Sequence, residues 1–154
     1  MAGTYSQIYI QVVFAVKGRA NLLQKAWRDE VFIKYIAGII KEKGQKSIIV
    51  NGVGDHVHCF IGLKPSITIS DLVRDIKNNS SRFINEKKFV KGKFQWQEGY
   101  AVFSYSNSQI EQVYNYIQNQ EEHHKKRTFK EEYIEFLEKF QIEFKEEFLF
   151  EWIV

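Results

Sequence analysis

The sequence has little of what extracellular and membrane proteins depend on. It contains a single cysteine, Cys59, which excludes an internal disulfide and fits a reducing cytosol. No apolar run is long enough to span a bilayer, and no secretory leader is recognisable. Repeats, low-complexity segments and linkers are also lacking. We therefore expect a single domain over residues 1–154, located in the cytoplasm and without a membrane partner.

Net charge is low as well, at +3, and by itself does not indicate a nucleic-acid partner. Its distribution along the chain is more informative. Residues 74–93 carry seven basic side chains against two acidic ones, whereas residues 129–154 carry three lysines against eight glutamates. The first segment could follow a phosphate backbone, which the second would avoid. Two solvated surfaces would explain the same pattern equally well.

Apolar and aromatic residues are plentiful, and their spacing predicts alternating strands and helices. The 13 phenylalanines and 8 tyrosines serve core packing first, but they also suit stacking on nucleobases. The predicted strands are residues 5–16, 47–53, 57–63 and 100–105. The predicted helices are residues 23–43, a helix that Ser70 caps at its start, residues 108–126 approximately, and residues 130–140. The last helix and an acidic tail together make up the segment 129–154. This order predicts an α+β fold of the ferredoxin-like or RRM-like split βαβ type, with an antiparallel sheet covered by helices.

Two histidines, His56 and His58, flank one apolar residue at the start of the third strand. Side chains alternate between the faces of a strand, so both imidazoles should point to one face while Val57 and Cys59 point to the other. Paired imidazoles on a rigid strand form half of a divalent-metal site. The alternative is that one histidine is a satisfied core residue and the other lies at the surface.

The helix after the fourth strand carries Tyr116 and Gln120, which share a face because they are four residues apart. Tyr114 falls on a different side. A phenol and a carboxamide could supply a nucleophile and an oxygen ligand. On its own, however, such a pair is usually surface decoration.

These segments together resemble a known family. The run DHVH followed by apolar residues resembles the HUH motif, and YIQNQ at residues 116–120 resembles the tyrosine-helix motif of single-tyrosine HUH transposases of bacterial insertion sequences. FQWQEGY before the fourth strand and NQEEHHKKRTF after the tyrosine are similar to this family too. The resemblance extends from the first strand to about Phe129. One departure is Ala101-Val102, where Gly-Ala is expected, and it should affect packing only.

The resemblance implies a DNA transposase that cuts and rejoins single-stranded DNA through a 5′-phosphotyrosine. It makes His56, His58 and Gln120 ligands of a divalent metal, Mg²⁺ or Mn²⁺, and Tyr116 the nucleophile. The implied partners are single-stranded DNA folded into hairpins and a second copy of the chain, in a homodimer joined through the sheets. In that dimer one subunit's tyrosine helix can complete the other's site. Such an enzyme would act in the bacterial cytoplasm, at the nucleoid when bound to DNA.

Several other residues are candidates for supporting roles. Asp55 either orients a ligating imidazole or forms the turn after Gly54. His123 and His124 are expected near the DNA path or the surface, and Trp96 either stacks on a base or packs beneath its loop. The expected contacts to the DNA backbone are Arg74, Lys77, Arg82, Lys87, Lys88 and Lys91.

Two other functions remain open at this point. A non-catalytic or domesticated nucleic-acid-binding module of RRM-like fold would use the histidines structurally and the aromatic residues for stacking. The RRM aromatic signature is missing from the sequence, which counts against this module. A metal-dependent phosphodiesterase would use water as the nucleophile and leave Tyr116 inert.

Overall fold

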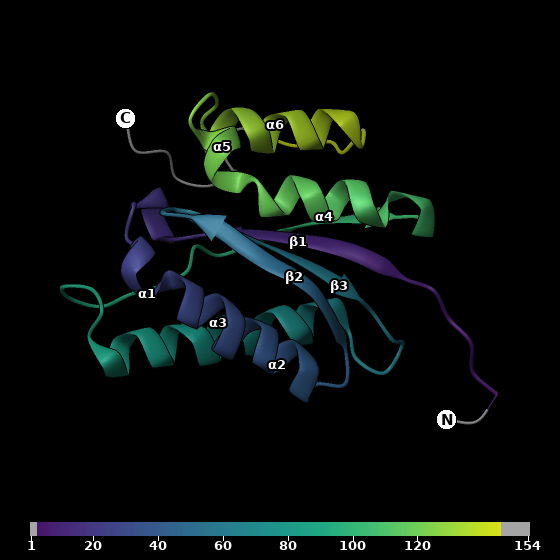
Figure 1. Cartoon of the computed structure of the whole chain (residues 1–154), viewed down its shortest axis with the longest axis horizontal. Coiled ribbons are helices and arrows are strands. Elements are labelled where there is room, and N and C mark those ends of the chain that lie inside the picture. Colours follow the sequence, from purple (N-terminus) through teal and green to yellow (C-terminus); the bar gives the residue numbers. More distant parts are fainter. Residues whose placement is uncertain (1–2, 146–154) are drawn as a thin grey trace.

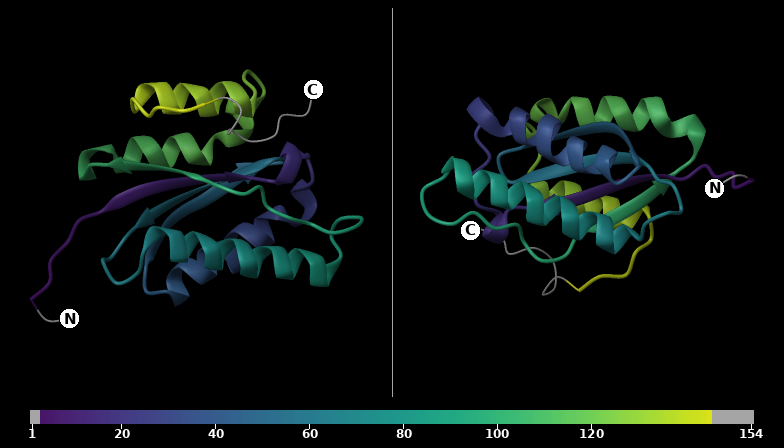
Figure 2. Two further views of the ribbon diagram at one scale, coloured as in Figure 1. Left: turned by 180° about the vertical axis from the view of Figure 1, so that it is seen from behind. Right: turned by 90° about the horizontal axis from the view of Figure 1, so that it is seen from below.

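The computed structural model describes residues 3–145, which form one sheet covered by helices on both faces (Figure 1). Helices α1, α2 and α3 cover one face, and α4, α5 and α6 cover the other (Figures 1 and 2). The strands are β1 (Tyr9–Ala15), β2 (Lys46–Val53), β3 (His56–Gly62) and β4 (Ala101–Tyr105). The helices are α1 (Lys25–Glu30), α2 (Ala37–Glu42), α3 (Ile69–Lys87), α4 (Ile110–Gln118), α5 (Gln120–His124) and α6 (Phe129–Lys139).

The sheet has the strand order β2-β3-β1-β4, and every neighbouring pair is antiparallel. The two central strands are thus β1 and β3, which leaves β2 and β4 at the edges. This arrangement confirms the predicted α+β fold of split βαβ type. The acidic tail beyond residue 145 lies outside the described residues.

The larger core lies between the sheet and helices α1 to α3. Alternate residues of β1 and β3, among them Val12, Phe14 and Cys59, are completely buried there. Trp96 belongs to the same core, because its indole is buried and its Nε1 donates to Ser80 Oγ at 2.9 Å. Trp96 therefore packs beneath its loop and is not available to stack on a base.

The opposite face of the sheet is covered by α4 and α6. Val113 and Ile117 of α4 pack on Phe60 of β3, while α6 packs its own apolar side chains on β1 and β4. Since strand side chains alternate, His56 and His58 point to this second face, as the sequence predicted. Both imidazoles are completely buried, so the alternative in which one of them lies at the surface is wrong.

The boundaries of three predicted helices differ from the observed ones. The segment 23–43 is interrupted by a π-helical stretch, η2 (Val31–Ile36), between α1 and α2. Thr68, not Ser70, caps α3, because its hydroxyl accepts a hydrogen bond from the Asp71 amide. The helix predicted over 108–126 begins after a short 3₁₀ turn, η3 (Asn107–Gln109), and is divided at Asn119 into α4 and α5.

Within residues 3–145, no helix combines the length and the apolar character that crossing a bilayer requires.

The pairing of β2 with β3 holds the two histidines in place and depends on a glycine. A Cβ at Gly52 would lie 2.2 Å from the His56 carbonyl oxygen and 2.9 Å from Val57 Cα. We expect Gly52→Ala to lower the free energy of unfolding by about 1–3 kcal/mol, as overpacking does elsewhere. Urea denaturation measures this change.

The matched control is Gly38→Ala in α2, where a Cβ would meet nothing within 4 Å. Alanine favours a helix over glycine by roughly 1 kcal/mol, so this variant should be as stable as the parent or slightly more stable. Equal stability of Gly52→Ala and the parent would contradict the close approach of β2 and β3.

Candidate metal centre and tyrosine nucleophile

The Nδ1 atom of each histidine on β3 donates to an oxygen acceptor. His56 Nδ1 lies 2.7 Å from Asp55 Oδ1, and His58 Nδ1 lies 2.6 Å from Gln11 Oε1. Gln11 is completely buried on β1, and its amide nitrogen donates to the Tyr105 hydroxyl at 2.8 Å. Because a carboxylate or amide oxygen accepts a hydrogen bond, each Nδ1 carries a hydrogen, and each Nε2 points inward.

Both inward nitrogens converge on one carboxylate that the sequence did not reveal as a site residue. Glu132 Oε1 lies 3.1 Å from His58 Nε2 and 3.4 Å from His56 Nε2. Glu132 is 1% exposed, so its charge is almost fully removed from water. A buried carboxylate is stable only where positive charge and hydrogen-bond donors surround it.

The protonation of the two imidazoles differs because their neighbours differ. Burial lowers the pKa of His56, but the carboxylates of Asp55 and Glu132 outweigh burial and raise it to about 9. Burial also lowers the pKa of His58, and there the charge of Glu132 does not offset it. A neutral His58 with its proton on Nδ1 presents an Nε2 lone pair to the carboxylate oxygen. A cation between these two atoms would make the contact favourable.

Glu132 stands in the first turn of α6, where an acidic side chain is favoured by the partial positive charge of the helix N-terminus. Thr128 caps this helix through a hydrogen bond from the Glu131 amide. Burial would raise the pKa of the Glu132 carboxyl, but the imidazoles of His58, His124 and His56 outweigh burial and hold it below its usual range.

Tyr116 and Gln120 reach the same carboxylate from α4 and α5. The Tyr116 hydroxyl donates to Glu132 Oε2 in a short hydrogen bond, and Gln120 Nε2 lies 3.4 Å from the same oxygen. Gln120 Oε1 faces His56 Nε2 at 3.3 Å. Burial and the neighbouring carboxylate raise the pKa of the Tyr116 phenol above its ordinary value. The phenol therefore stays protonated in this arrangement.

The sheet itself anchors the end of the tyrosine helix. The side-chain amide of Asn51, on β2, donates to the carbonyl oxygens of Ile117 and Gln118 at 3.0 and 3.2 Å. These carbonyls belong to the last turn of α4, where the regular helical hydrogen bonds end. Asn51 thus holds the end of α4, at Asn119, against the sheet next to β3, the strand that carries His56 and His58.

Of the two expected places for His123 and His124, the DNA path or the surface, the structure excludes the surface, because both histidines lie beside the tyrosine. His124 Nε2 is 3.3 Å from Glu132 Oε1, although it is buried without the geometry of a hydrogen bond. The His123 ring stacks on the Tyr116 ring, with centroids 4.5 Å apart. The imidazole of His124 therefore faces the carboxylate as a third nitrogen beside His56 and His58, and the imidazole of His123 covers the phenol.

The donor set fits a divalent metal ion. Ligand atoms of His56, His58 and Glu132 lie within 4.8 Å of one another. Two ligand atoms at about 2.1 Å from a common ion lie at most about 4.2 Å apart, so a small inward shift is sufficient. The unsatisfied Nε2 of His124 and the lone pair of His58 Nε2 support the fit.

The basic residues expected to contact DNA lie on the other side of the sheet, on α3 and the loop after it (Figure 1). Lys87, Lys88 and Lys91 are exposed, and so is Arg82. Lys77 instead donates to the carbonyl oxygens of Gln97 and Gly99 at 2.9 and 2.7 Å, and burial lowers its pKa to about 8.

Arg74 makes local ion pairs with Asp71 and Asp75. The basic side chains of α3 and its following loop therefore lie far from Tyr116, on the opposite face of the sheet. A DNA strand that contacts these side chains and Tyr116 of one chain would pass around an edge of the sheet.

Sequence patterns missed Glu132 and Gln11 for different reasons. Glu132 is one of eight glutamates after residue 128, and nothing in the sequence separates it from the others. Gln11 is a polar residue inside an apolar strand, completely buried. A buried polar side chain in a central strand requires a partner, and that requirement was the one available signal.

Comparison with known proteins places this geometry in a family. The model of the family described as "Transposase IS200 like" matches residues 4–120. None of the functionally curated proteins compared with the chain matches it.

Two solved structures share the fold. The first is a protein from Deinococcus radiodurans assigned as a transposase, with 24% identity, a TM-score of 0.63, and coverage of 78% of this chain and 95% of that one. The second is a REP-associated tyrosine transposase bound to a REP hairpin, with 14% identity, a TM-score of 0.57, and coverage of 80% and 74%. Since the family model spans well over half of the sequence, the chain belongs to the IS200-like transposase family.

Proposed function

We propose that this transposase cuts and rejoins single-stranded DNA through a covalent 5′-phosphotyrosine at Tyr116, with a divalent metal bound beside it. One observation carries the proposal. The Tyr116 hydroxyl and the inward nitrogens of His56 and His58 meet at the same carboxylate, that of Glu132. Phosphodiester transfer needs a nucleophile next to a set of metal ligands, and here both would contact the same carboxylate.

The metal, Mg²⁺ or Mn²⁺, would be held by His56, His58 and Glu132, with Gln120 as the further oxygen ligand. Such an ion polarises a phosphoryl oxygen and stabilises the negative charge that develops during transfer. Asp55 and Gln11 orient the two imidazoles through their Nδ1 atoms, so that both Nε2 atoms already point toward Glu132 and only a small inward shift is needed. His124 adds a third nitrogen at the same place.

The chemistry assigned to Tyr116 is an in-line displacement at phosphorus. The phenolic oxygen forms the new bond to phosphorus, and the bond from phosphorus to the 3′ oxygen breaks, which leaves a free 3′ hydroxyl. The phenolic proton passes along its hydrogen bond to Glu132 Oε2, and Glu132 then returns a proton to the departing 3′ oxygen. Because the phosphotyrosine keeps the energy of the broken bond, a 3′ hydroxyl can later reverse the step and reseal the strand without ATP.

The DNA partner would be a single strand folded into a hairpin. The REP hairpin bound by one structural neighbour supports this substrate. Contacts to the backbone are assigned to the basic side chains of α3 and its following loop, namely Arg74, Lys77, Arg82, Lys87, Lys88 and Lys91. Homodimerisation through the sheets stays part of the proposal, although Tyr116 reaches the histidines of its own chain.

The second candidate is a non-catalytic DNA-binding module. One observation favours it: the imidazoles of His56 and His58 already contact the Glu132 carboxylate directly in a buried polar network. In that case the histidines would stabilise the fold and bind no metal. The two candidates differ in whether a covalent adduct forms.

Removing the nucleophilic oxygen tests the proposal directly. Tyr116→Phe should abolish the covalent protein–DNA adduct formed with Mn²⁺ and hairpin oligonucleotides from the DNA flanking the gene, because no phenolic oxygen remains. DNA binding should change by no more than about fivefold, since one hydrogen bond is worth about 1 kcal/mol. A denaturing gel scores the adduct.

Tyr114→Phe is the matched control, because Tyr114 is two residues away on the same helix and 37% exposed. It should form as much adduct as the parent. Cleaved product without adduct in Tyr116→Phe would indicate attack by water. Tight binding without cleavage by the parent protein would favour the non-catalytic module.

The role of Glu132 as a ligand has its own test. Glu132→Gln removes the charge but keeps the size of the side chain, so it should weaken Mn²⁺ binding by at least about tenfold in titration calorimetry. Glu138→Gln makes the same change at an exposed position of α6 and should bind Mn²⁺ like the parent. Unchanged affinity in Glu132→Gln would remove this carboxylate from the metal site.

A further inference from the structure

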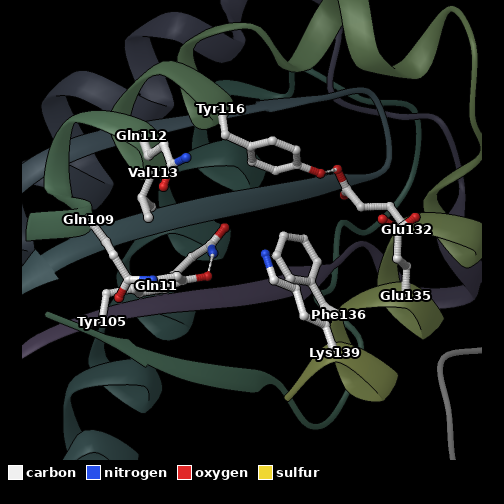
Figure 3. A pocket seen from close by; sticks show the side chains of 10 residues that line it. All are labelled: Gln11, Tyr105, Gln109, Gln112, Val113, Tyr116, Glu132, Glu135, Phe136 and Lys139. Carbon is white, nitrogen blue, oxygen red and sulfur yellow. Dashed lines mark hydrogen bonds between the residues drawn. The ribbon is translucent and has the colours of Figure 1, made fainter. Parts of the chain in front are cut away.

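A recess of about 260 Å³ lies beside Tyr116, between α4 and α6 (Figure 3). Gln112 and Tyr116 line it from α4, and Phe136 and Lys139 line it from α6. Tyr105, the last residue of β4, and Gln11 of β1 form its floor. None of the proposed steps at phosphorus uses this space.

We propose that this recess binds the nucleobase of a nucleotide next to the phosphate that Tyr116 attacks. The inference rests on the proposed function, since Tyr116 is both the nucleophile and one wall of the recess. It adds a protein pocket that takes a base out of the stack and thereby positions the strand.

The side chains in the recess have the chemistry that nucleobases require. Phe136 offers an aromatic ring, and bases stack on aromatic side chains whatever their sequence. The Gln112 carboxamide makes no hydrogen bond within the described chain and so offers both a donor and an acceptor to a base edge. The Tyr105 hydroxyl accepts from Gln11, which leaves its own proton to donate.

The size of the recess favours one flat ring system over a larger ligand. Drug-sized molecules occupy pockets of about 300–1,000 Å³, and 260 Å³ falls just below that range. It corresponds to roughly nine waters at about 30 Å³ each. A nucleobase still attached to its strand would fit such a partly open space.

The charges around the recess are compatible with an anionic strand. Glu135 at its edge pairs with the guanidinium of Arg127, and Glu132 is surrounded by imidazoles. Lys139 is exposed at the rim and could meet a phosphate. The hydroxyl of Tyr116 points from the recess to Glu132, so a base in the recess belongs to a nucleotide close to the attacked phosphate (Figure 3).

The first test is photocrosslinking, which does not depend on cleavage. The parent protein is mixed, in a metal chelator, with single-stranded 20-nucleotide DNA of random sequence that carries one 5-iodouracil per strand. After irradiation, mass spectrometry should find the crosslink on the peptides containing Phe136 or Tyr105. Crosslinks confined to other peptides would overturn the proposal, whether or not the protein cleaves DNA.

The second test measures whether the effect of removing a base depends on the Phe136 ring. Once adduct formation has located the cleaved bond, abasic sites are placed on either side of it. Loss of the correct base should slow adduct formation about tenfold in the parent and less than about twofold in Phe136→Leu, because in that variant the base has no ring to stack on.

Phe140→Leu is the control, since Phe140 packs on Phe103 and Tyr105 but does not line the recess. It should keep the full tenfold effect of the abasic site. If adduct forms but the abasic effect is equal in the parent and Phe136→Leu, the base pocket is wrong while the tyrosine mechanism stands. If no adduct forms, the tyrosine mechanism is wrong, and the crosslinked peptide alone decides the pocket.

Discussion

The buried carboxylate of Glu132 is the constraint on which the site depends. An ionised carboxylate away from water is tolerated only with compensating partners, and here every partner belongs to the proposed site. Its Oε1 faces the imidazoles of His56, His58 and His124, and its Oε2 accepts from Tyr116. One charge therefore holds together a strand and three helices, and it gathers the residues of the proposed metal site and the proposed nucleophile at one point.

The fold supplies the rigidity that this gathering requires. A central strand, β3, fixes the spacing and direction of the two histidines, and its neighbour β1 contributes Gln11 to orient one of them. The edge strand β2 holds the end of the tyrosine helix through Asn51. Because these supports come from hydrogen-bonded strands, the imidazoles are positioned before any ligand arrives. The recess beside Tyr116 adds a place where the substrate strand itself would be held.

Much of the fold was predictable from the sequence, because strand alternation and helical spacing are local properties. Alternation alone placed His56 and His58 on one face and Cys59 in the core. The i, i+4 spacing brought Gln120 near Tyr116 even though the helix breaks at Asn119. Glu132 was not predictable, because its approach depends on how the turn before Phe129 folds α6 back over the sheet.

The central claim is that His56, His58 and Glu132 bind a divalent metal within reach of the Tyr116 hydroxyl. Anomalous diffraction from crystals grown with saturating Mn²⁺ tests it most directly. The account predicts a single manganese peak bounded by His56 Nε2, His58 Nε2 and Glu132 Oε1, within reach of the Tyr116 hydroxyl. A structure with no manganese there, in which the imidazoles still contact Glu132 directly, would contradict the claim and leave a purely structural polar network.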